Sequence, residues 1–292
     1  MAGAEKDAEG GFIGGTPGFV HLRVHSAYSL LEGALPLKKI LYKASGDSQP
    51  AIAITDTNNL FVALEFSQKA MDEGLQPIIG CQVSIDMEDG LETERRGGQQ
   101  ALVKLPSLVL LAASDAGYER LVDLVSRAYL GGEGNGQSIH IRASWLHEIA
   151  TDGLIALTGA LTGPIDMALK DGHTAQAEAR LLLLKRHFGD RLYVELQRHG
   201  TYDKRHEQKL IGLAYEHDLP LVATNEAFFP TRDDYDAHDA LMAVAHNAIV
   251  SDDTRFRLTP DHYLKSRAEM AKLFADLPVS YTHLTLPTIY SV

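Results

Sequence analysis

The feature of the sequence that most constrains the fold is a series of seven short apolar runs separated by segments with helical periodicity. The runs are rich in Val, Ile and Leu and occupy residues 19–24, 51–54, 77–85, 108–113, 154–158, 192–196 and 221–224. Uninterrupted apolar strands of this length are typical of a parallel sheet that is buried on both faces. The pattern therefore predicts an α/β fold, and the strand count favours a distorted, seven-stranded, TIM-like β/α barrel.

The segments between these runs carry apolar residues at the spacing of an amphipathic helix. We expect helices over residues 37–44, 59–73, 118–129, 173–187, 202–217, 234–246 and 266–274. Asn59 is placed to cap the second of these helices. The polar, acidic segment 87–106 is expected to be a surface loop.

Charge and composition exclude several classes of protein. The chain has 27 basic and 39 acidic residues, a net charge of −12, so it is not expected to bind duplex DNA strongly by itself. No apolar run is long enough to span a membrane. Cys81 is the one cysteine in the sequence, so neither an intramolecular disulfide nor a CxxC metal site can form.

The two ends of the sequence differ from its centre. Residues 1–18 are rich in glycine and charge and lack the apolar core of a signal peptide, so we expect a flexible leader and a cytoplasmic protein. Residues 19–278 are expected to form one domain. Residues 279–292 contain no Asp, Glu, Lys or Arg, and this atypical tail is interpreted as a truncation scar or sequence artefact.

Polar side chains follow the ends of the predicted strands, where the functional residues of a β/α barrel lie. They are His25, Asp56, Gln82, Ser107, His199, Asn225 and Glu226. Such a set could supply nitrogen and oxygen ligands to a metal. A lone histidine at a strand end is more often structural, and ten others are interpreted as structural or surface residues: His140, His147, His173, His187, His206, His217, His238, His246, His262 and His283.

Six ordered motifs give the sequence a specific resemblance. They are HLRVHSAYSLLEG at 21–33, AITDTNNL at 53–60, PIIGCQ at 77–82, LLA at 110–112 before Gly117-Tyr118, ELQRHG at 195–200 and PLVATNE at 220–226. The chain resembles the PHP (polymerase and histidinol phosphatase) domain family. Within it, the chain is most similar to the N-terminal PHP domains of bacterial replicative DNA polymerases, the DNA polymerase III alpha subunits. The resemblance spans residues 19–278 and implies a distorted barrel of seven strands.

Active members of this family are metal-dependent phosphoesterases with a trinuclear site, and the resemblance implies that the site is degenerate here. The positions of that pocket hold His21, Arg23, His25, Asp56, Thr57, Gln82, Ser107, His199, Glu226 and Phe228. Arg23, Thr57, Gln82, Ser107 and Phe228 stand where the family places ligands. Because an arginine adds positive charge where cations would sit, we expect no intact metal site and no catalytic residue.

The resemblance therefore implies an inactive, N-terminal part of a replicative polymerase. It would stabilise the rest of the alpha chain within the holoenzyme and dock the proofreading exonuclease subunit. It would need no cofactor, with Mg²⁺ expected only in the missing polymerase region.

Two active alternatives stay open. One is a Zn²⁺- or Mn²⁺-dependent 3′–5′ exonuclease or pyrophosphatase that uses His25, Asp56, His199 and Glu226. The other is a free-standing phosphatase of small molecules, which the polymerase-like segment TPDHYLKS at 259–266 argues against.

Arg23 carries the sharpest structural expectation. It lies two residues before His25, on the same face of the first predicted strand. We predict that its guanidinium takes the place of a metal and pairs with Asp56, Glu226 or both, because a carboxylate left unpaired in a buried pocket is costly. The alternative is that Arg23 extends to solvent at the mouth of the barrel.

Overall fold

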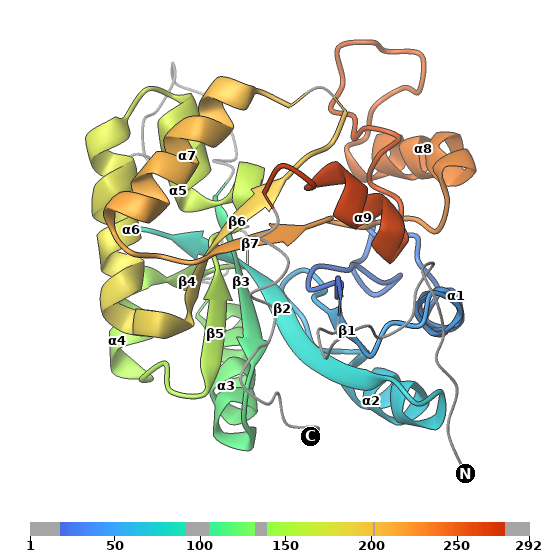
Figure 1. Cartoon of the computed structure of the whole chain (residues 1–292), viewed down its shortest axis with the longest axis horizontal. Coiled ribbons are helices and arrows are strands. Elements are labelled where there is room, and N and C mark those ends of the chain that lie inside the picture. The colour runs from blue at the N-terminus through green and yellow to red at the C-terminus, as the bar shows by residue number, and fades with distance from the viewer. Residues whose placement is uncertain (1–17, 91–104, 132–138, 201, 278–292) are drawn as a thin grey trace.

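The computed structural model of the chain describes residues 18–90, 105–131, 139–200 and 202–277. In this part of the chain, one curled seven-stranded sheet has the order β1-β2-β3-β5-β6-β7, and β4 pairs with β2 outside this path (Figure 1). The strands are β1 (Ala51–Ile54), β2 (Gln76–Asp86), β3 (Ser107–Ala112), β4 (Ile141–Arg142), β5 (Leu154–Leu157), β6 (Leu192–Gln197) and β7 (Leu221–Thr224). The expected leader up to residue 17 and the expected tail lie outside the described residues.

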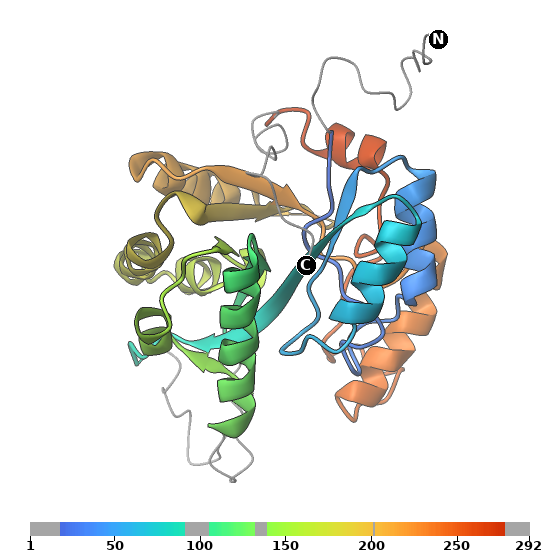
Figure 2. The same ribbon diagram turned by 90° about the horizontal axis from the view of Figure 1, so that it is seen from below.

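Helices cover the outside of the sheet, with α1, α2 and α8 on one side and α3 to α7 on the other (Figure 2). Their bounds are α1 (Leu37–Gly46), α2 (Ala63–Asp72), α3 (Asp115–Leu130), α4 (Ala143–Glu148), α5 (Pro164–Lys170), α6 (Thr174–Phe188), α7 (Lys204–Glu216), α8 (Tyr235–Ala245) and α9 (Arg267–Leu273). In the described residues, no helix has both the length and the apolar character needed to cross a membrane.

All seven predicted helices are present, and two short ones, α4 and α5, were not foreseen. Helix α6 buries Ala177, Leu181, Leu184 and Phe188, the stripe expected from its spacing. The expectation that Asn59 caps α2 is wrong, since the helix begins at Ala63 and Val62 occupies the cap position. Asn59 instead accepts a hydrogen bond from the backbone N–H of Phe61.

The sheet is mixed, which corrects the expectation of parallel strands throughout. Strand β3 runs antiparallel to both of its neighbours, β2 and β5, whereas the pairs β1–β2, β5–β6 and β6–β7 are parallel. The described residues between β2 and β3, 87–90 and 105–106, contain no helix. The chain reverses direction between β2 and β3, and two adjacent antiparallel strands need no crossover helix to connect them.

Residues 19–25, which include the first predicted strand at 19–24, form no regular strand, yet they join the two ends of the sheet. The carbonyls of His21 and Val24 accept hydrogen bonds from the N–H groups of Ala53 and Thr55, at 2.8 and 2.9 Å. On the other side, the N–H of His25 donates to the carbonyl of Ala227 at 2.9 Å. Segment 19–25 therefore bridges β1 and the residues after β7 through sparse backbone hydrogen bonds.

The interior of the sheet has an apolar layer and a polar layer. Val20, Leu22, Ala53, Ile78, Val109, Leu111, Ile155, Leu157 and Val222 form one buried cluster. Because side chains alternate along a strand, Gln82 continues the inner face of β2 beyond Ile78, and Ser107 that of β3 before Val109. Thr224 likewise follows Val222 on β7. The polar residues thus gather at one end of the barrel, above the apolar cluster.

Two glycines inside helices test how closely the helices pack. A Cβ at Gly117 in α3 would lie 1.9 Å from the carbonyl oxygen of Gly153, whereas one at exposed Gly212 in α7 would meet no atom within 4 Å. We expect Gly212→Ala to raise the free energy of unfolding by roughly 0.5–1 kcal/mol, since alanine favours helix. Gly117→Ala should lower it by about 1–3 kcal/mol through overpacking. Chemical denaturation measures both, and equal effects would contradict the packing described.

Candidate functional site

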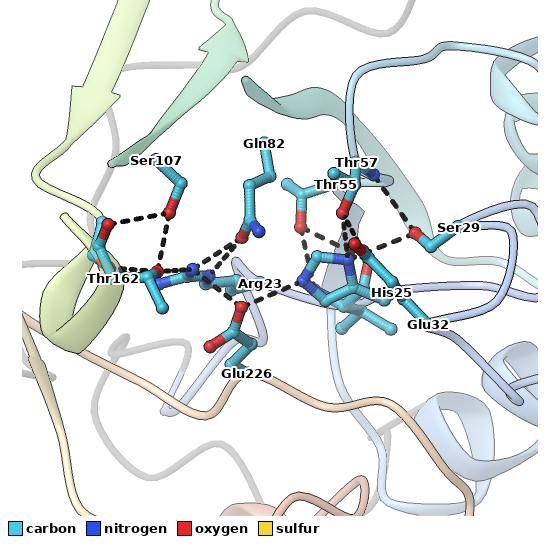
Figure 3. Close-up of polar contacts among 12 residues, drawn as sticks. Arg23, His25, Ser29, Glu32, Thr55, Thr57, Gln82, Ser107, Thr162 and Glu226 are labelled. Atoms are coloured by element: carbon cyan, nitrogen blue, oxygen red, sulfur yellow. Dashed lines mark hydrogen bonds and ion pairs between the residues drawn. The ribbon is translucent and has the colours of Figure 1, made fainter. Parts of the chain in front are cut away.

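Arg23 lies at the centre of the polar end of the barrel, and its side chain is fully buried (Figure 3). Its Nε and Nη2 atoms donate to Oε1 of Gln82 at 3.0 and 2.6 Å. Nη2 also donates to Oε1 of Glu226 at 2.8 Å, and Nη1 to both carboxylate oxygens of Glu195 at 3.3 Å. The guanidinium therefore occupies the position between two carboxylates and an amide oxygen.

Two of these partners are acidic, so the pocket holds one fixed cation against two anions. The prediction that Arg23 pairs with Glu226 is confirmed, and the alternative of a solvent-exposed Arg23 is wrong. Glu195, in the middle of β6, was not foreseen as a partner. Its neighbours in the sequence, Val194 and Leu196, are both apolar. An acidic residue inside a buried strand needs a partner, and this signal could have identified Glu195 as part of the site.

Glu195 is satisfied by neutral donors as well as by Arg23. Its Oε2 accepts from the N–H of Gly159 at 3.0 Å, and its Oε1 accepts from the Thr224 hydroxyl and from Nε2 of Gln197. Gly159 also accepts from Arg23 Nη1 through its carbonyl, at 3.0 Å. The φ of this glycine is +81°, and a Cβ there would lie 2.0 Å from the carbonyl oxygen of Ser107, so only glycine fits.

The pKa values of the ion pair show that both charges persist. Burial alone would raise the pKa of Glu226, but the Arg23 guanidinium and His25 overcome this effect and hold it well below its usual range. Burial likewise disfavours the charge on Arg23, yet Glu195 and Glu226 raise the Arg23 pKa above its usual value. The guanidinium and the Glu226 carboxylate thus stay ionised throughout the physiological pH range.

His25 adjoins this group on the other side of Glu226. Its Nε2 lies 3.3 Å from Oε1 of Glu226, and its ring stacks on Phe228 with centroids 4.3 Å apart. Its Nδ1 lies 3.2 Å from the Ser29 hydroxyl and 3.4 Å from that of Thr57, which donates to Oε2 of Glu32 at 2.5 Å. His25, Thr57, Glu226 and Phe228 are therefore brought together as the sequence predicted.

Of the two carboxylates predicted as alternative partners of Arg23, Glu226 makes the pair and Asp56 has other partners. Its Oδ1 accepts from the N–H of Ser26 at 2.7 Å and from the Ser29 hydroxyl at 2.6 Å, and its Oδ2 accepts from the Ser26 hydroxyl at 2.7 Å. Both carboxylate oxygens are thus held by the loop that follows His25. A nearby cation is not needed to stabilise this charge, because three neutral donors already do so.

The remaining predicted residues lie around the Arg23 group at different distances. Ser107 reaches it through Thr162, whose hydroxyl lies 2.6 Å from that of Ser107 and accepts from Arg23 Nη2 at 3.1 Å. His21 is turned away, with its Nε2 2.8 Å from the carbonyl oxygen of Lys265, and burial lowers its pKa to about 4.

His199 belongs to a separate histidine pair. Its ring stacks on His262 with centroids 3.8 Å apart, and burial lowers its pKa well below the usual value. His262, one of the ten histidines interpreted as structural or surface residues, is a buried one, and burial lowers its pKa to about 4. Sequence spacing gives no sign of this contact, since the two rings are 63 residues apart.

The residues present do not fit the metal centre that the PHP resemblance implies. Among the described residues, no three His, Cys, Asp or Glu side chains are arranged to hold a metal ion. Both oxygens of Asp56 and Oε1 of Gln82 are committed to hydrogen bonds, and Oε1 of Glu226 is bonded to Arg23. A cation brought to Glu226 would meet the positive guanidinium.

Comparison with known proteins shows the family of this chain. The PHP domain family matches residues 21–199. The chain belongs to the PHP domain family. It is also 45% identical to the DNA polymerase III subunit alpha of Caulobacter vibrioides over 273 residues, 93% of this chain and 23% of that protein. The protein of the same name from Pseudomonas aeruginosa is 38% identical over 90% of this chain and 22% of its own length.

The chain thus spans less than a quarter of these relatives. An amidohydrolase structure from Chromobacterium violaceum aligns with a TM-score of 0.49 and 15% identity, covering 73% of this chain and 89% of its own. A score this low adds no argument.

Replacing Arg23 tests the ion group directly. Arg23→Ala would orphan Glu195 and Glu226, so we expect it to lower the free energy of unfolding by about 3–5 kcal/mol. Arg127→Ala is the matched control, because Arg127 pairs with Asp123 and Glu148 at the surface and its loss should cost under ~1 kcal/mol. Urea denaturation at neutral pH compares the two variants. Similar small losses in both would contradict a buried, charged Arg23 group.

Proposed function

We propose that this chain is a catalytically inactive PHP domain of a bacterial replicative DNA polymerase, the DNA polymerase III alpha subunit. In this role it stabilises the polymerase chain and provides a docking surface for the proofreading exonuclease subunit. The observation that carries the proposal is the buried Arg23 guanidinium. It donates hydrogen bonds to Glu226 and Gln82, which stand at positions where the family places metal ligands.

The inactivity follows from charge and from ligand chemistry. A phosphoesterase of this family needs cations to activate water and to neutralise the phosphate. Here the cation is an arginine that carries no exchangeable water, and its donors are bonded to protein atoms. Phe228, which stacks on His25, offers no ligand at all. Because Arg23 already balances Glu195 and Glu226, the pocket needs no metal to neutralise these carboxylates, and this fits a structural role.

The polymerase role is supported by the relatives. Both relatives named above are called DNA polymerase III subunit alpha. The Caulobacter protein matches 93% of this chain, and the Pseudomonas protein matches 90% of it. The net charge of −12 agrees with a domain that contacts protein partners and does not itself grip the DNA backbone. Polymerase activity, with its Mg²⁺, would reside in regions of the relatives that this chain does not cover.

One observation favours the alternative of an active phosphoesterase. Nε2 of His199 is buried without a hydrogen-bond partner in the described residues, and Nε2 of His25 faces Oε1 of Glu226 at 3.3 Å. Imidazole nitrogens that are unpartnered or that face a carboxylate are what a metal site presents before it is loaded. In that alternative, His25, Asp56, His199 and Glu226 would hold Zn²⁺ or Mn²⁺ once Arg23 had moved away.

Activity measurements separate the two functions. We expect the purified chain to show no phosphatase and no 3′-exonuclease turnover above background with added Mn²⁺ or Zn²⁺, because Arg23 excludes the cations. The double variant His25→Ala, Asp56→Ala is the control for contaminating enzymes and should give the same background. Turnover by the parent chain that disappears in the double variant would refute the proposed inactivity.

A further inference from the structure

Two histidine side chains from different helices lie next to each other at the surface. The ring centroids of His147, in α4, and His187, in α6, are 6.1 Å apart, and the ring planes are tilted by 57°. His147 is exposed and His187 is half-buried. Both rings are therefore within reach of solvent and of each other.

Backbone contacts hold the two histidines in place. The hydroxyl of Thr151, four residues after His147, donates to the carbonyl oxygen of His187. Nη1 of Arg191, four residues after His187, donates to the carbonyl oxygen of Thr151. The end of α4 is thus tied to the end of α6, and the rings are neighbours before any ligand binds.

This histidine pair lies at the opposite end of the barrel from the Arg23 group. Thr151 precedes β5, whereas Gly159, whose carbonyl oxygen accepts from Arg23, follows it. Both α4 and α6 belong to the helices on one side of the sheet (Figure 1). In β/α barrels the end where the strands begin serves stability, whereas chemistry takes place where the strands end.

Neither ring has a partner that would keep it from a ligand. In the described part of the chain, the rings of His147 and His187 form no hydrogen bond or ion pair, whereas His206 and His217 each pair with a carboxylate. Burial, together with the neighbouring His147 and Arg186, lowers the pKa of His187, so its imidazole is neutral at neutral pH. A neutral imidazole nitrogen is the form that binds metal ions.

The distance between the rings suits a shared metal ion. With metal–nitrogen bonds of about 2.0–2.1 Å, two imidazoles on one tetrahedral ion have centroids roughly 5 Å apart, and about 6.5 Å when the bonds are opposed. The observed 6.1 Å lies inside this range, so one ion can bind both rings once their nitrogens turn toward it. Arg186 repels a cation, but it is exposed and its charge is screened by salt.

We propose that His147 and His187 form a binding site for one divalent transition-metal ion of the zinc and copper class, with water completing its coordination. The ion crosslinks α4 to α6 and stabilises this end of the barrel. It takes no part in a phosphoesterase centre, because the Arg23 group lies at the other end. Mn²⁺ and Mg²⁺ prefer oxygen ligands, so they bind this pair weakly.

Calorimetric titration of the purified chain with Zn²⁺ at about pH 7.5 tests this site. We expect one Zn²⁺ to bind and to raise the melting temperature, because an ion that binds the folded chain stabilises it. His147→Ala and His187→Ala should each weaken binding at least about tenfold and abolish the rise, since even residues that only support a ligand contribute about 10–100-fold. His173→Ala, at an exposed histidine before α6, is the matched control and should change neither result.

An electron paramagnetic resonance spectrum of the parent chain with one equivalent of Cu²⁺ decides the case if either variant fails to fold. Splitting from two imidazole nitrogens is expected, and a spectrum without it would overturn the proposal. The proposal is also overturned if Zn²⁺ gives no binding heat at about 1 mM, or if His173→Ala weakens binding as much as His147→Ala does. Binding that is lost in His25→Ala and kept in His147→Ala would place the ion in the barrel pocket and would refute the surface site.

Discussion

The buried ion group of Arg23, Glu195 and Glu226 is the interaction on which the polar end of the barrel depends. Removing three charges from water is expensive, and the cost is offset only when every charge has partners. Here the guanidinium reaches both carboxylates, and Glu195 receives further donors from Gly159 and Thr224. Because these groups come from separate parts of the chain, the ion group fixes how β6, β7, the turn at Gly159 and segment 19–25 lie together.

This arrangement explains how a PHP barrel can keep its shape without metal ions. Carboxylates that point into a closed space must be neutralised, either by bound cations or by the chain itself. Arg23 supplies a cation that cannot dissociate, and Asp56 is stabilised separately by Ser26 and Ser29. The structural role proposed for the domain follows from this replacement of metal ions by Arg23. A fold that does not depend on metal ions can present a docking surface whether or not metal is available.

Much of the fold could be predicted from the sequence, because apolar runs and helical stripes report burial directly. They located the helices and all of the long strands, and motif positions led to the contact between Arg23 and Glu226. The direction of β3 could not be predicted, since a strand buried on both faces reads the same in either direction. Glu195 was missed because its partner is 172 residues away and meets it only when the sheet curls. The sequence left open whether Asp56 or Glu226 pairs with Arg23, because the neutral donors to Asp56, Ser26 and Ser29, carry no charge signal.

Anomalous X-ray diffraction from crystals of this chain soaked in Mn²⁺ tests the central claim most directly. The account predicts continuous density from Arg23 to Glu195 and Glu226, and no anomalous peak between these side chains. An anomalous peak within about 2.0–2.6 Å of a Glu226 oxygen, with the guanidinium displaced, would show a working metal site and contradict the account.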